Sequence, residues 1–135
     1  AGGDRAAAAA SEPAIATEAM IAYAYDTVTR RNPLGFFGMV HVLEGTSVAL
    51  ALAAADRIQQ TLGLPTRAFT YLRSHGELDK EHVNDLAAIL ARLTEAEDRE
   101  AVIRCARGIY WLYGQVFRGL DTAVAAVPEP QRRIA

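Results

Sequence analysis

The segment from Leu34 to Leu62 most constrains the fold, because apolar residues run through it almost without a break. Asn32-Pro33 before it suits a helix N-cap and first helical position, and Gly63 followed by Pro65 suits a helix end. A helix that is apolar on all sides is usually the central helix of a bundle. Its longest uninterrupted apolar run, Val48 to Ala55, falls far short of the roughly 20 residues that span a bilayer. We therefore expect a bundle and no membrane partner.

The rest of the chain also has helical patterns. Ser11-Glu12-Pro13 is typical of a helix start, and a loose apolar stripe follows it as far as Arg30-Arg31. Thr94 to Glu97 has the spacing of a capping box and precedes a long apolar stripe from Val102 to Val124. No segment shows the alternation of a strand. The sequence predicts an all-α fold of four or five helices, with short connections between antiparallel neighbours.

Length and composition predict one folded domain. The chain has 135 residues, 51% of them hydrophobic and 22% charged, which is typical of globular proteins. Ala1 to Ala10 shows no apolar period, so we expect a disordered or frayed tail or a helix remnant there, and a single helical domain over residues 11–135. The net charge is −2 and no basic stripe appears, so no nucleic-acid partner is expected. A single cysteine and the lack of a signal segment favour a reducing, cytoplasmic location.

Two short stretches contain the three histidines of the chain, and each stretch also has a carboxylate. In the longer stretch, His75, Asp79 and His82 are spaced i, i+4 and i+7, which places them on one narrow face of a helix. Two imidazoles and one carboxylate on one face can bind iron, manganese or zinc. A helix cap followed by solvated polar residues would produce the same spacing.

The second stretch places His41 and Glu44 one turn apart on the apolar helix. Burying Glu44 without a partner would cost several kcal/mol, so either a metal or an arginine such as Arg107 or Arg118 is implied. His41 is either a hydrogen-bonded histidine of the core or a further metal ligand.

The last predicted helix contains the single cysteine and four of the ten aromatic residues. We expect Tyr110, Trp111, Tyr113 and Phe117 to pack in the core and between helices, and Cys105 to be a buried structural thiol. No glycine-rich phosphate loop, G-x-S-x-G or CxxC motif is present, so nucleotide-dependent and thiol-exchange chemistry is not expected.

Val42-Leu43-Glu44-Gly45-Thr46-Ser47 resembles the Leu-Glu-Gly segment of the heme-oxygenase-like helical fold. The stretch from His75 to His82 resembles the His-x3-Asp-x2-His helix of the non-heme branch of that fold. These proteins are the heme-oxygenase-like diiron oxidases and oxygenases, iron-containing redox enzymes grouped with TenA-like proteins. The helix around Ala106 to Arg118 is also similar, and the resemblance extends from about Ala22 to Leu120.

The resemblance implies a helical bundle that binds iron, two ions if the site is complete, with manganese or zinc as possible substitutes. With O₂ it would oxidise a small organic substrate. The residues that match family ligands are Glu44, His75, Asp79 and His82. The family supplies another Glu and His, seven residues apart, from an upstream helix. Here Glu18 is followed seven residues later by Tyr25, so the chain resembles the C-terminal part of the fold.

We therefore expect an iron-dependent oxidoreductase. The alternatives are a non-catalytic metal-binding or scaffold protein with an incomplete site, and a TenA-like or heme-binding protein. We also expect a homo-oligomer. A chain without the upstream helices would leave apolar surface uncovered on the helix at 34–62, and a dimer would bury it.

Overall fold

The computed structural model describes residues 4–125, and these residues contain helices and no strand. The predicted all-α fold is therefore confirmed. The helices are α1 (Arg5–Ala10), α2 (Ile15–Arg30), α3 (Phe36–Leu62), α4 (Thr70–Leu90) and α5 (Ala96–Ala125), with short 3₁₀ helices at Pro33–Gly35 and Thr66–Phe69. The expected single domain extends to residue 135, and its last ten residues lie outside the described part.

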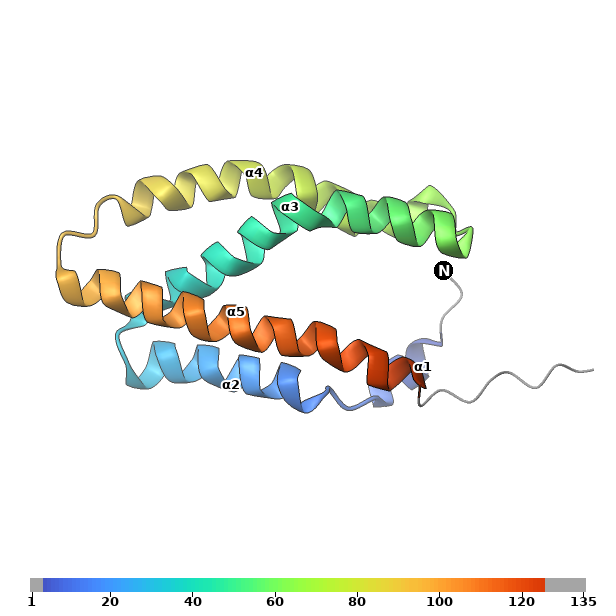
Figure 1. Cartoon of the computed structure of the whole chain (residues 1–135), viewed down its shortest axis with the longest axis horizontal. Coiled ribbons are helices and arrows are strands. Elements are labelled where there is room, and N and C mark those ends of the chain that lie inside the picture. Colours follow the sequence, from blue (N-terminus) through green and yellow to red (C-terminus); the bar gives the residue numbers. More distant parts are fainter. Residues whose placement is uncertain (1–3, 126–135) are drawn as a thin grey trace, which may run out of the picture.

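The helices form two antiparallel pairs, α2 with α5 and α3 with α4, and α3 joins the pairs by also packing on α5 (Figure 1). Helix α2 packs on α5, and α4 packs on α3, which also contacts α5. In Figure 1, α3 begins beside α2 and α5 and then runs away from them towards α4. The central position predicted for the apolar segment is thus confirmed.

Several helix ends follow local sequence signals, but the predicted start at Ser11 is wrong, because α2 begins at Ile15 after Ala14, which has no capping side chain. The Asn32 side chain accepts a hydrogen bond from the Leu34 N–H at 3.1 Å, as expected of an N-cap. Gly63 ends α3 in the left-handed conformation at φ 61°, which glycine adopts without steric cost. The expected N-terminal tail is helical over Arg5–Ala10, where Asp4 caps the first turn by accepting from the Ala6 N–H at 2.8 Å.

A glycine allows α3 and α5 to cross closely. A Cβ atom on Gly38 would lie 2.3 Å from the Val102 carbonyl oxygen and 2.6 Å from the Ala106 nitrogen. Real Cβ atoms do not approach so closely, so only glycine fits here. Next to this crossing lies the core cluster of the bundle, which contains Val42, Cys105 and Ile109.

The aromatic residues of α5 do not all pack in the core. Tyr113 packs against the core cluster, but Tyr110, Trp111 and Phe117 are 69%, 63% and 51% exposed. The expectation that the whole set packs inside is therefore wrong. The reason is angular, because at 100° per residue the inward stripe through Cys105 leaves these three side chains pointing elsewhere.

Helix α3 also leaves much apolar surface uncovered. The stretch Pro33–Leu62 has a mean hydropathy of 1.5 in its most apolar window, and by length and composition alone it could cross a membrane. The central helix of a bundle meets the same criteria. Only 17% of that window is buried within the described residues, so this helix has apolar surface available to a covering partner.

Candidate metal centre

The structure brings three of the predicted ligands together where α3 packs on α4. Glu44 comes from α3, while Asp79 and His82 come from α4, and one ligand atom of each lies within 4.8 Å of the others. His82 Nδ1 is 3.5 Å from Asp79 Oδ1 and 3.6 Å from Glu44 Oε1. These distances are too long for good hydrogen bonds, so the three groups surround a common point without binding one another tightly.

Two carboxylates in this group are poorly solvated. Asp79 is 5% exposed, and the Glu44 Oε2 atom is buried without a hydrogen-bond partner among the described residues. A buried carboxylate oxygen without a partner is destabilising by several kcal/mol, which a bound cation would offset. No arginine of the described residues supplies that charge, and Arg107 and Arg118 lie on α5 beside the cavity between α3 and α5. The interpretation that Glu44 pairs with one of them is therefore wrong.

The donor set suits a transition metal. Imidazole nitrogen together with carboxylate oxygen is a ligand set that iron, manganese and zinc accept. Ligand atoms about 2.1 Å from one ion are at most about 4.2 Å apart, so the group at 4.8 Å needs only a small inward shift to hold an ion. The residues present therefore fit a metal ion.

His75 lies on the same helix but outside this group of three. Its Nδ1 is 3.1 Å from the Tyr71 carbonyl oxygen, and its ring stacks on the Tyr71 ring with centroids 3.9 Å apart. Because a carbonyl only accepts, this bond requires a proton on Nδ1 and leaves the lone pair on Nε2. Metal-binding histidines usually donate their other N–H in this way. Ligation by His75 stays a prediction. The hydrogen bond and the ring contact of Tyr71 with His75 were not predicted from the sequence, although Tyr71 lies one turn before His75.

His41 is exposed on α3, so the interpretation of a packed core histidine is wrong. The structure does not place it in the group with Glu44, and its ligation stays a prediction. Upstream, Glu18 and Tyr25 are exposed on α2, where Tyr25 reaches 69% exposure. No fourth histidine or carboxylate of the described residues joins the group of three.

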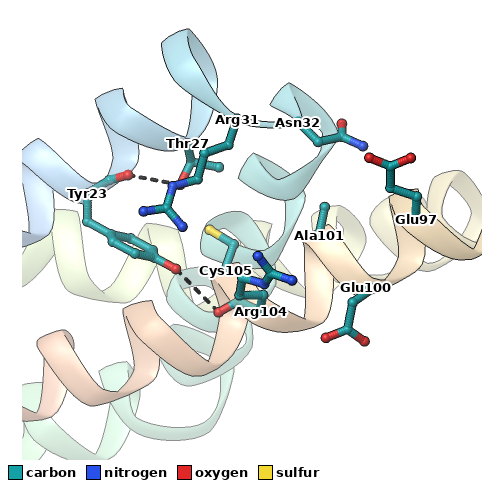
Figure 2. Close-up of a pocket in the computed structure, with 9 residues that line it drawn as sticks. All are labelled: Tyr23, Thr27, Arg31, Asn32, Glu97, Glu100, Ala101, Arg104 and Cys105. Carbon is teal, nitrogen blue, oxygen red and sulfur yellow. Dashed lines mark hydrogen bonds between the residues drawn. The ribbon is translucent and has the colours of Figure 1, made fainter.

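Apart from the metal ligands, a cavity of about 290 Å³ lies between α2 and α5, and Cys105 lines it (Figure 2). Cys105 is 2% exposed, and burial raises the pKa of its thiol, which confirms the expected structural role. Tyr23 Oη lies 3.4 Å from the Arg104 carbonyl oxygen, and burial likewise raises the pKa of this phenol. Both groups therefore stay protonated at neutral pH, and this cavity holds no activated nucleophile.

Comparison with protein-family models identifies the family of this chain. A family model described as iron-containing redox enzyme, of the heme-oxygenase type, matches residues 1–114. No curated protein and no solved structure matches the chain. The family match includes α3, α4 and most of α5, and therefore all of the residues that could bind the metal.

Proposed function

Because the chain belongs to the family of iron-containing redox enzymes, we propose that it is an iron-dependent oxidoreductase with Glu44, Asp79 and His82 as metal ligands. The observation that carries this proposal is the Glu44 carboxylate. Its Oε2 atom is buried without a partner among the described residues, and its Oε1 atom lies 3.6 Å from His82 Nδ1, beside Asp79. His75 is a further ligand in this proposal, through Nε2, the ring nitrogen that does not face the Tyr71 carbonyl. Two ions, O₂ as oxidant and a small organic substrate are further parts of it.

The residues of the chain have separate roles in this proposal. Bound iron supplies the capacity to exchange electrons. Asp79 and Glu44 compensate its charge and fix its position between α3 and α4, since both lie on preformed helices. The Tyr71 carbonyl holds the proton on His75 Nδ1 and so keeps the other ring nitrogen ready to bind. The low exposure of Asp79 keeps water away from that side of the ion.

The second candidate function is a non-catalytic metal-binding protein. The observation that favours it is the size of the group, because three residues from two helices fall short of a dinuclear set. The two candidates differ in whether bound iron reacts, so one experiment must measure both metal content and oxygen consumption.

The test uses protein loaded with Fe(II) without oxygen, followed by metal analysis. We expect iron in the wild-type protein and at least tenfold less in Asp79→Asn, which keeps the shape of the side chain but removes its charge. Glu81→Gln is the matched control, because Glu81 is an exposed carboxylate two residues away on α4. Circular dichroism should show equal helicity in all three proteins.

Full iron content in Asp79→Asn would overturn the proposed ligand set. If the iron-loaded wild-type protein consumes no O₂ in the presence of a reductant, the non-catalytic candidate replaces the oxidoreductase. His75→Ala and His41→Phe extend the series. We expect a loss of iron in the first and test the second as the remaining candidate ligand.

A further inference from the structure

A larger cavity, of about 480 Å³, lies between α3 and α5. Thr46 and Leu50 line it from α3, and the exposed aromatic residues of α5, Trp111 among them, form much of its wall. On α3, Thr46 is two residues and therefore about 200° away from Glu44, so this cavity faces away from the metal ligands. Its volume falls within the usual range of small-molecule sites.

Two guanidinium groups line this cavity without a counter-charge. Arg107 and Arg118 lie eleven residues apart on α5, about 16 Å along the helix axis, with the aromatic side chains between them. Neither has a hydrogen bond or an ion pair with any residue in the described part of the chain. Arg31, which lines the cavity between α2 and α5, is by contrast paired with Asp26.

A glycine inside α5 sets the position of one of these groups. A Cβ atom on Gly114 would lie 3.1 Å from Arg118 Nη1, so the guanidinium lies against the helix surface where a side chain would otherwise be. Glycine in a helix interior is unfavourable relative to alanine. Here the missing side chain leaves room on the helix surface for the Arg118 guanidinium, which lines the same cavity as the aromatic residues.

The charges argue against a second copy of this chain as the occupant of the cavity. A two-fold symmetric contact between two α5 helices, antiparallel and centred near Gly114, would place Arg107 of one copy near Arg118 of the other. Like charges opposed in this way repel each other. An occupant with an apolar body and one negative group fits better, because guanidinium groups bind carboxylates through paired hydrogen bonds.

We propose that the cavity between α3 and α5 binds a small organic carboxylate, with its apolar body on Trp111 and Phe117 and its carboxylate on Arg118. This site is separate from the metal ligands, and the proposal holds whether or not the protein binds iron.

Trp111 is the only tryptophan of the chain, so its fluorescence reports occupancy of this cavity directly. The probes are octanoate and octanamide, which share an alkyl chain and differ in charge. In the metal-free protein, we expect octanoate to change the Trp111 emission saturably and to bind about tenfold more tightly than octanamide.

Arg118→Gln should reduce octanoate binding to the level of octanamide. Gly114→Ala should weaken it as well, because the added methyl group displaces the guanidinium while the helix stays intact. Arg104→Gln is the control, since Arg104 is an exposed arginine of the same helix that lines the α2–α5 cavity instead.

Three outcomes would overturn the proposal. The first is equal binding of octanoate and octanamide, and the second is an equal loss in Arg104→Gln and Arg118→Gln. The third is a Trp111 emission that depends on protein concentration without any carboxylate, which would show that a second copy covers the cavity.

Discussion

Gly38→Ala should destabilise the protein, although the same change stabilises most helices. Alanine is favoured over glycine in a helix interior by about 1 kcal/mol. At Gly38 the new methyl carbon would lie 2.3 and 2.6 Å from two backbone atoms of α5, whereas ordinary contacts begin near 3.4 Å. Backbone atoms cannot rotate away, so α3 and α5 must separate by about 1 Å.

That separation also loosens the core cluster around Val42 and Ile109, which packs beside the crossing. Overpacking of a core costs typically 1–3 kcal/mol and sometimes more. Because the added methyl group would meet the α5 backbone at two atoms, we expect an overpacking cost of about 3–4 kcal/mol at this position. Subtracting the gain in helix propensity leaves a net destabilisation of about 2–3 kcal/mol.

Gly45→Ala is the matched control, because it makes the same change on the same helix two turns later. A Cβ atom on Gly45 would meet nothing within 4 Å among the described residues. Only the propensity gain then applies, and we expect a stabilisation of up to about 1 kcal/mol.

The assay is urea unfolding followed by far-ultraviolet circular dichroism. With a slope of about 1.5 kcal/mol per molar urea, the midpoint should fall by about 1–2 M in Gly38→Ala and rise slightly in Gly45→Ala. A Gly38→Ala protein as stable as the wild type would refute the close crossing. Equal destabilisation by both changes would show that the cause is not α5.

Three further predictions concern α2 and its contact with α5. Gly108→Ala should destabilise the protein less than Gly38→Ala. The atoms that a new methyl group at Gly108 would meet are at the far end of the Tyr23 side chain, which can move. A lower urea midpoint for Gly108→Ala than for Gly38→Ala would contradict this. The Cys105 thiol should react with Ellman's reagent at least about 100-fold more slowly in the native protein than in urea, since it is buried and its pKa is raised, and similar rates would contradict this. The hydrogen bond from Arg31 holds the pKa of Asp26 below its usual value. The ion pair of Asp26 and Arg31 therefore stabilises the folded protein fully above about pH 4, and this stabilisation is lost as the pH falls through the folded-state pKa of Asp26. Asp26→Asn should therefore be less stable than the wild type at neutral pH and approach it in acid, and a constant difference down to about pH 2 in thermal unfolding would refute the ion pair.

The sequence predicted what depends on local pattern. The start and end of the apolar helix followed from Asn32 and Gly63, whose capping roles need only near neighbours. The common face of Asp79 and His82 followed from helical spacing. These features were predictable because they lie within one helix or at its ends.

The sequence could not show what depends on the rotation of one helix against another. Whether Glu44 meets a metal site or an arginine depends on which side of α3 faces α4, and the hydrophobic pattern of an all-round apolar helix does not encode that side. The prediction that the aromatic residues of α5 pack inside was wrong for a related reason. Periodicity placed Val102 and Ile109 on the inward stripe of α5, but Leu120 of the same stripe is 52% exposed. Periodicity also did not show that no other described element covers Tyr110 and Trp111.

The arrangement of ligands on two helices makes a bound metal an internal cross-link. Glu44 and Asp79 are separated by 35 residues of chain, and an ion held by both would close that loop only in the folded protein. Free metal at 100 times its dissociation constant would then add about 2.7 kcal/mol to the free energy of unfolding. With the proposed metal bound, the apparent stability of this protein would therefore be a function of metal concentration, and a chelator would lower it.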